Sequence, residues 1–285
     1  MPFSQPDINM LLRCGTQTLD LARPAVMGVL NVTPDSFSDG GKFLDIAAAV
    51  AHGQRMAEEG AHIIDVGGES TRPGADPVSV DEEIRRVVPV IAQLRAKTGA
   101  VISVDTSKPE VMRAAGEAGA GLLNDVRAFS EPGALEAAAA TRCAICVMHM
   151  QGDPQTMQLA PHYDDVVNEV RAFLLERVAA CRAAGVTPDR IAIDPGFGFG
   201  KTLEHNLELL RQLRKLGSEW PIIVGLSRKS FVGRITGRGP GERVHGSVAF
   251  AMMAVLNGAN IVRVHDVGPT MDALKTVMAV QRLGE

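Results

Sequence analysis

The chain has 285 residues, of which 46% are hydrophobic and 22% charged, and its formal net charge is -4 with histidine neutral. Because a net negative charge repels polyanions, neither nucleic acid nor an anionic membrane surface is expected as a main partner. No stretch reaches the roughly 18 apolar residues of a membrane-spanning helix, and the opening residues MPFSQPDINM lack the basic and apolar parts of a signal peptide, so we expect a cytoplasmic protein.

Short apolar runs alternate with longer helical patterns along the whole chain. In order, the runs are AVMGVL (25–30), HIIDV (62–66), VISV (101–104), GLL (121–123), CAICVM (143–148), IAI (191–193), PIIV (221–224) and NIVRV (260–264). This alternation is typical of βα units around a parallel sheet. It predicts an α/β fold, a TIM (β/α)8 barrel, as a single domain over residues 1–285 with its core at about 20–283. A doubly wound sheet is the alternative, but no glycine fingerprint follows the first run.

The segments between the runs carry helix start signals and two unusual loops. In Ser107-Lys108-Pro109-Glu110 the serine is expected to cap a helix, with the glutamate reaching back to it. The loops NVTPDSFSDGG (31–41) and GGESTRPGADPVS (67–79) are long and rich in Gly, Pro, Ser and Asp. Such loops often serve as lids or binding loops. The C-x-x-C inside CAICVM reads as part of a buried strand, so free, reduced thiols are expected.

Polar groups stand where the predicted strands end, and in a barrel these ends meet at one rim. In chain order they are Asn31, Asp105, Asn124, Met148 with His149, Asp194, Lys229, and Arg263 with His265. Any one Asp or Asn at such a place can be no more than a helix cap or turn former. Asn31 is also a hard oxygen donor suited to Mg²⁺, which takes few protein ligands beside phosphates and water. Lys229 and Ser230, near an expected helix start, can bind a carboxylate.

Together these groups suggest a binding site for two kinds of ligand. Asp105, Asn124 and Asp194 offer the acceptors and donors that match the edge of a flat nitrogen heterocycle. Arg263 and His265 are two apart on one strand, so they face the same side and can jointly hold an anion.

The stretch DPGFGFGKT (194–202) looks at first like a phosphate-binding loop. The P-loop pattern, however, needs a glycine where Pro195 stands, and proline has no N–H to offer a phosphate. The dinucleotide fingerprint also fails, because the three glycines are spaced by two throughout. What remains is a carboxylate at a strand end, Asp194, followed by a glycine-rich turn.

Seven motifs occur in order: MGVLNVTPDSFSDGG, IIDVGGESTRPGA, SVDTSKPEV, VMHMQGDP, DPGFGFGK, GLSRKS and RVHDV. Together they resemble the dihydropteroate synthase family, from about residue 20 to the C-terminus. The resemblance implies a transferase of folate biosynthesis that joins 6-hydroxymethyl-7,8-dihydropterin diphosphate to 4-aminobenzoate, releasing diphosphate and 7,8-dihydropteroate. It also implies Mg²⁺ dependence, a homodimer and competition by sulfonamides.

The same resemblance assigns roles to individual residues. The positions that match pterin-binding residues are Asp105, Asn124, Met148, Asp194 and Lys229. Those that match residues around the diphosphate and in loop closure are Thr71, Arg72, Arg263 and His265. Those that match the aminobenzoate side are Phe37, Pro73, Phe199, Lys229 and Ser230. Asn31 matches the Mg²⁺ position, the expected catalytic group is Asp105, Lys229, Arg263 and His265, and Lys201 is expected at the surface.

Three alternatives remain at this stage. The chain can be another pterin-binding barrel, such as a corrinoid-dependent methyltransferase, although methyl transfer needs neither a diphosphate nor an aminobenzoate pocket. It can be a Schiff-base aldolase that uses Lys229, or a catalytically silent paralogue that only binds pterin. An aromatic amine attacks as a neutral nucleophile, which agrees with the lack of a Ser-His-Asp or Cys-His arrangement.

Overall fold

The computed structural model describes residues 10–33, 42–70, 76–153, 156–217 and 219–282. Its centre is a parallel sheet of eight strands in the order β8-β7-β6-β5-β4-β3-β10-β9. The strands are β3 (Ala25–Asn31), β4 (Ile63–Gly67), β5 (Val101–Asp105), β6 (Leu122–Asp125), β7 (Ala144–Met148), β8 (Ile191–Asp194), β9 (Ile223–Gly225) and β10 (Ile261–Val264). A parallel bridge between Ile193 and Ile222 brings the two edges of the sheet together. The eight predicted strands and the TIM barrel are confirmed.

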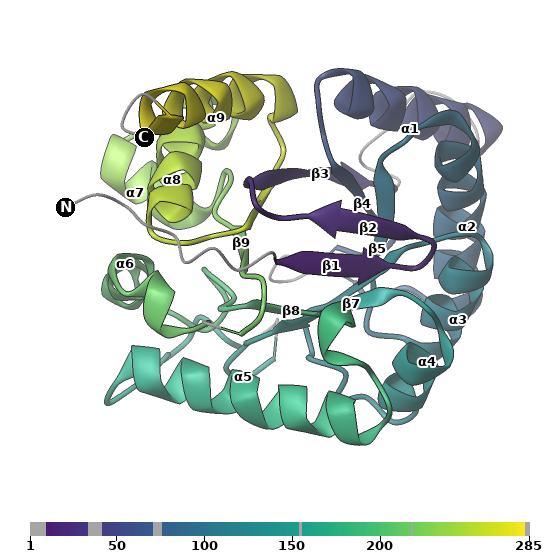
Figure 1. Cartoon of the computed structure of the whole chain (residues 1–285), viewed down its shortest axis with the longest axis horizontal. Helices are drawn as coiled ribbons and strands as arrows, with labels where there is room; N and C mark the ends of the chain where they lie inside the picture. The colour runs from purple at the N-terminus through teal and green to yellow at the C-terminus, as the bar shows by residue number, and fades with distance from the viewer. Residues whose placement is uncertain (1–9, 34–41, 71–75, 154–155, 218, 283–285) are drawn as a thin grey trace.

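Helices surround the barrel and follow the strands in sequence (Figure 1). They are α1 (Lys42–Glu58), α2 (Val80–Lys97), α3 (Pro109–Glu117), α4 (Ala134–Ala140), α5 (Val166–Ala183), α6 (Leu203–Arg211), α7 (Ser230–Thr236), α8 (Val244–Leu256) and α9 (Val267–Arg282). Short 3-10 turns lie at Pro188–Arg190, Leu213–Lys215 and Pro240–Glu242. Within the described ranges, no helix combines the length and apolar character needed to cross a membrane.

The start of α3 differs from the prediction. Lys108 occupies the N-cap position and provides no side-chain cap. The hydroxyl of Ser107 instead donates to Asp125 at 2.5 Å, across to the end of β6. The sequence signal for a cap was therefore overridden by a buried carboxylate that needed a donor.

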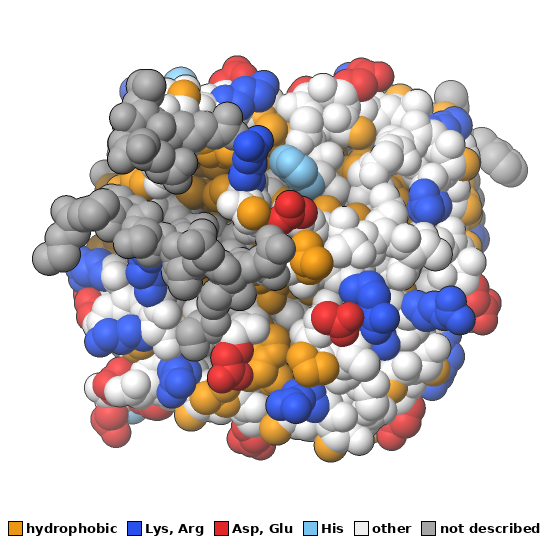
Figure 2. All heavy atoms as spheres, in the orientation of Figure 1, with side chains coloured by type: hydrophobic (Ala, Val, Ile, Leu, Met, Phe, Trp, Pro, Cys, Tyr) orange, Lys and Arg blue, Asp and Glu red, His pale blue; other side chains and the backbone are white. Residues whose placement is uncertain are grey.

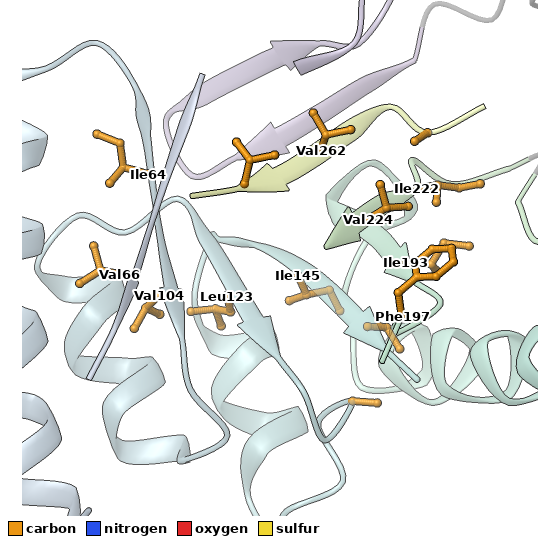
Figure 3. Close-up of a cluster of buried hydrophobic side chains, with 14 of the residues drawn as sticks. Ile64, Val66, Val104, Leu123, Ile145, Ile193, Phe197, Ile222, Val224 and Val262 are labelled. Atoms are coloured by element: carbon orange, nitrogen blue, oxygen red, sulfur yellow. The ribbon is translucent and has the colours of Figure 1, made fainter. Parts of the chain in front are cut away.

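The alternation of side chains along each strand divides the core in two. Outward-facing residues pack against the helices, and Figure 3 labels several of them: Ile64, Val66, Val104, Leu123, Ile145, Ile193, Val224 and Val262. Inward-facing residues near the strand starts form a second apolar cluster inside the barrel, which includes Met27, Ile63, Val101, Leu122 and Ile261. One end of the barrel interior is therefore filled with apolar side chains.

A two-stranded hairpin that was not predicted covers this apolar end. It consists of β1 (Leu11–Cys14) and β2 (Gln17–Asp20), which pair antiparallel and lie over the middle of the barrel, inside the ring of helices, in Figure 1. Leu12 and Cys14 point into the inner apolar cluster and are buried. The backbone N–H of Gly15 donates to the carbonyl of Arg142 at 3.0 Å. The hairpin thus closes the amino-terminal end and leaves the carboxyl ends of the strands for a site.

The surface that carries the hairpin shows basic side chains interspersed with acidic ones (Figure 2). Among the described residues on this face, charges of one sign do not form an extended field.

Candidate active site

The carboxyl ends of four adjacent strands bring polar side chains to one level of the barrel. The strand register pairs Asn31 with Gly67, Gly67 with Asp105, and Asp105 with Asn124. Because parallel strands place paired residues side by side, three of the predicted site residues are neighbours around the rim. Gly67 adds no side chain between Asn31 and Asp105.

Arg263 joins two of the adjacent strands through a network inside the barrel. Its Nε donates to Asp65 Oδ2 at 2.6 Å, and its Nη2 donates to Asp105 Oδ2 at 2.8 Å. The Nδ2 of Asn124 donates to the same Asp65 oxygen at 3.2 Å. The guanidinium therefore faces carboxylates, whereas the sequence had suggested an anion-binding arginine at this place. An incoming anion would share it with Asp65 and Asp105.

Two carboxylates compete for this one guanidinium. Burial raises the pKa of Asp105 to about 7, Arg263 opposes the shift, and Asp65 adds to it. Asp65 is fully buried, and its Oδ1 has no hydrogen-bond partner among the described residues. Asp105 can therefore take up or release a proton near neutral pH.

Sequence reasoning missed Asp65. It lies in the middle of the run HIIDV, where we expected only a buried strand. Two residues after the inward-facing Ile63, it has the same orientation and points into the barrel. A charged residue inside an otherwise apolar strand was the available signal.

Asp194 and Met148 lie together on the far side of the rim. They are register partners on β8 and β7. The Oδ1 of Asp194 accepts a hydrogen bond from the backbone N–H of Gly196 at 2.7 Å, which fixes the carboxylate at the mouth of the following turn. Burial raises the pKa of Asp194, while the Gly196 N–H and Lys229 oppose the shift.

Lys229 approaches the same turn from the end of β9. Its Nζ donates to the carbonyl of Phe197 and lies 4.3 Å from the centre of the Phe199 ring. Burial lowers the pKa of Lys229 to about 7, partly offset by Asp194. Ser230 follows as the first residue of α7 and is exposed. The structure thus brings Asp194, Lys229 and Phe199 together.

His265 follows Arg263 on the same side of β10. Its Nδ1 lies 3.1 Å from Ser227 Oγ, which also accepts from the His265 backbone N–H at 3.2 Å. A hydroxyl that accepts from the backbone can still donate to Nδ1, which leaves the proton on Nε2. The neighbouring Arg228 does not contribute to the rim network, because it pairs with Asp266.

Four predicted site residues lie outside the described residues: Phe37, Thr71, Arg72 and Pro73. They belong to the two long loops, so the prediction that these loops act as lids stays a prediction. Asn31, at the end of β3, is described and half-buried. Its side-chain amide makes no hydrogen bond to any residue that the structure describes.

The prediction for Lys201 was wrong. Only 3% of this residue is exposed. Its Nζ lies 2.9 Å from each of three acceptors, which are His149 Nδ1 and the carbonyl oxygens of Gly196 and Phe199. The lysine of DPGFGFGKT thus binds its own turn, which agrees with the interpretation that the stretch is not a phosphate loop.

The comparison with protein families gives one match to this arrangement. Residues 27–265 match the family described as pterin binding enzyme. The matched segment begins at Met27 within β3 and ends at His265, so it contains most of β3, the other seven barrel strands and every described residue of the candidate site.

Relatives with a known name resemble the chain over nearly its whole length. Dihydropteroate synthase of Escherichia coli K12 is 53% identical over 263 residues, covering 92% of this chain and 93% of that protein. The structure of Xanthomonas albilineans dihydropteroate synthase with 4-aminobenzoic acid superposes with a TM-score of 0.91 at 55% identity, covering 96% and 99% of the two chains. The complex of the X. albilineans enzyme with 7,8-dihydropteroate gives a TM-score of 0.87 at 52% identity, covering 95% and 98%.

Proposed function

Because this chain belongs to the dihydropteroate synthases of the pterin-binding enzyme family, we propose that its rim residues divide between a pterin diphosphate and 4-aminobenzoate. The enzyme is a transferase that condenses these two substrates to 7,8-dihydropteroate and diphosphate. The observation that carries the division is the network of Arg263, Asp65, Asp105 and Asn124, because it joins acids, an amide and one cation on neighbouring strands.

The pterin ring is proposed to lie against the inner wall of the rim. Asp105 and Asp194 would accept hydrogen bonds from ring N–H groups, and the amide of Asn124 can both donate and accept. Lys229 would donate to a ring oxygen or nitrogen, and Met148 would pack on the apolar face of the ring. Both carboxylates are held in place before the substrate arrives, Asp105 by Arg263 and Asp194 by its turn.

The diphosphate is proposed to bind beside β10. Arg263 and His265 project from the same side of this strand. A bound anion would compete with Asp65 and Asp105 for the N–H donors of the Arg263 guanidinium. Thr71 and Arg72, outside the described residues, are proposed to close over the same group. Charge-assisted contacts of this kind favour the leaving diphosphate as its charge grows.

Asn31 is proposed as the protein ligand of a Mg²⁺ ion at the diphosphate. Its half-buried amide oxygen is free of hydrogen bonds to the described residues, and Mg²⁺ takes few protein ligands beside phosphate oxygens and water. The described residues contain no group of three or more His, Cys, Asp or Glu that could hold a metal by themselves. Bound there, the ion would neutralise diphosphate charge.

The aminobenzoate side is proposed to lie at the turn after β8. Phe199 would pack on the aromatic ring, and Lys229 and Ser230 would contact the carboxylate. Pro73 and Phe37, outside the described residues, are proposed to complete this pocket. The same surface would accept sulfonamides as competitors.

The chemistry requires no strong base. The bond between the pterin methylene carbon and the diphosphate oxygen breaks, and its electron pair leaves with the diphosphate. The remaining cation is spread over the ring and stabilised by Asp105. The amino nitrogen of 4-aminobenzoate then forms the new C–N bond and loses a proton, which a diphosphate oxygen or water can accept.

Release of diphosphate is expected to require both 4-aminobenzoate and Mg²⁺. The experiment supplies the purified chain with pterin diphosphate, with or without 4-aminobenzoate, and measures diphosphate and dihydropteroate. Excess chelator should suppress both products and added Mg²⁺ should restore them. Full activity in excess chelator would refute the metal assignment, and pterin binding without any turnover would indicate a silent paralogue.

The chain is also proposed to be a single domain that works in the cytoplasm as a homodimer. All four cysteines are buried and free, as predicted, which suits a reducing compartment.

For the dimer, the supporting feature is α8, which has no Asp, Glu, Lys or Arg in its thirteen residues. A helix that is apolar all round is normally buried, yet Met253 is 50% exposed, as is Ile235 on the adjoining α7. A second copy of this chain would cover this face with the same face of its own.

Replacing Met253 by lysine is expected to convert a dimer into a monomer, because it places a charge at the centre of an apolar contact. Sedimentation velocity measures the change. The matched control is Leu11→Lys, which alters another half-exposed apolar residue, in the hairpin and not on α7 or α8. A wild-type monomer, or a variant that stays dimeric, would contradict this interface.

A further inference from the structure

The turn that follows β8 is unusually constrained. Gly196, Gly198 and Gly200 all have positive φ, at 66°, 79° and 61°. A Cβ at Gly196 would come within 1.8 Å of the His149 carbonyl oxygen, and one at Gly200 within 2.5 Å of the Gln151 carbonyl oxygen. Glycine is therefore required both by the backbone conformation and by contact with the segment after β7.

Lys201 binds both ends of this turn through its ammonium group. The N–H of Phe199 donates to the carbonyl of Gly196, which closes the turn. The Nζ of Lys201 then binds the carbonyl oxygens of both Gly196 and Phe199, the first and last residues of that turn. The third contact, to His149 Nδ1, ties the turn to the end of the neighbouring strand.

The protonation states fit these contacts. Burial and the charge of Lys201 lower the pKa of His149 to about 3, so its imidazole is neutral and Nδ1 can accept. Burial also lowers the pKa of Lys201, but three acceptors at 2.9 Å match the three N–H donors of an ammonium group. Lys201 therefore satisfies all its donors within the protein and has none to offer a substrate.

The opposite side of the same turn faces Lys229. The carbonyl of Phe197 accepts from Lys229 Nζ, and the ring of Phe199 lies 4.3 Å from that nitrogen. Both groups belong to the four-residue turn that Lys201 binds at its two ends. Moving the turn would move the acceptor and the ring that fix Lys229.

We propose that Lys201 is a positioning residue for the aminobenzoate side: it fixes the turn 196–199 and, through Phe197 and Phe199, the site of Lys229. This inference rests on the proposed role of Phe199 and Lys229. It assigns Lys201 no contact with either substrate. On the pterin side, Asp194 accepts from Gly196 and Lys229 is shared. Asp105 and Asn124, however, lie on β5 and β6 and make no hydrogen bond to the described residues of the turn, so the pterin side depends less on the lysine.

The test is Lys201→Met, which keeps the length of the side chain and removes its donors. KM for 4-aminobenzoate is expected to rise about tenfold, the effect of losing a hydrogen bond to a charged group, whereas KM for pterin diphosphate changes less than about threefold. The matched control is Tyr163→Phe, which removes a hydroxyl that donates to Gly200 on the same loop but outside the turn. It should change neither KM by more than about twofold.

A second variant covers the case in which Lys201→Met does not fold. His149→Phe removes one acceptor and keeps an aromatic ring beside Phe173, whose centre lies 4.9 Å away. It should raise KM for 4-aminobenzoate selectively and by less. Equal changes for both substrates, or no change in a folded variant of either kind, would overturn the proposal.

Phe199→Ala separates this inference from the site assignment. If that variant keeps the wild-type KM for 4-aminobenzoate, the assignment of the aminobenzoate side is wrong. If it raises this KM while Lys201→Met and His149→Phe do not, the assignment stands and only the role of Lys201 fails.

Discussion

Replacing Asp105 by asparagine is expected to lower kcat/KM for pterin diphosphate by about 100- to 1,000-fold, the usual effect of removing one group that faces developing charge. The amide cannot neutralise the pterin cation, and its NH₂ group can face ring N–H donors where the carboxylate accepted from them. The barrel should stay folded, because burial raises the pKa of Asp105 and ionising it already costs folding free energy. Steady-state kinetics and circular dichroism measure the two effects.

The pH profile identifies the carboxylate as the cause. With its pKa raised to about 7, Asp105 becomes ionised as the pH rises through neutrality, so wild-type kcat/KM should fall below that point. The asparagine variant should lose this acidic limb. The control is Asp189→Asn, which removes an exposed carboxylate that pairs with Arg13 on the surface. Near-normal turnover in the folded variant, or an unchanged acidic limb, would remove Asp105 from the mechanism.

The strands and their polar ends could be predicted because both depend on local pattern. Eight apolar runs separated by helices leave few topologies open, and a parallel barrel brings the carboxyl ends together whatever the details of packing. The positions of Asp105, Asn124 and Asp194 at the rim could therefore be predicted from the pattern alone. The network that joins Arg263 to Asp65 was not, because it depends on which inward-facing residues meet across the barrel interior.

The remaining differences come from contacts between distant segments. Lys201 follows a glycine-rich turn, and its sequence gives no sign that His149 offers it an acceptor. The hairpin of β1 and β2 is short, and its inward residues Leu12 and Cys14 are stabilised by the inner apolar cluster, which local pattern does not reveal. In both cases tertiary packing overrides a weak local preference.

Replacing Arg263 by alanine is expected to impair both pterin diphosphate binding and folding. The variant loses a charge-assisted contact to phosphate, so KM for pterin diphosphate should rise far more than KM for 4-aminobenzoate. It also leaves Asp65 and Asp105 buried without their cation, and breaking a buried pair in this way costs about 3–5 kcal/mol of unfolding free energy. Urea unfolding at neutral pH and substrate titrations measure the two losses. Equal rises in both KM values would show that the arginine is structural only.

The dependence of the stability loss on pH tests its origin. Arg263 holds the pKa of Asp105 down, so without this arginine the pKa should rise above its wild-type value of about 7. Between pH 7 and that higher pKa, the folded variant binds a proton that folded wild type does not, so the deficit of the variant against wild type should shrink as the pH falls toward 7. The control, Arg13→Ala, breaks the exposed pair with Asp189 and should cost less than about 1 kcal/mol at any pH. A deficit in unfolding free energy that stays constant with pH would instead indicate lost packing around the arginine. It would contradict the view that two buried acids hold Arg263 in place until the diphosphate binds.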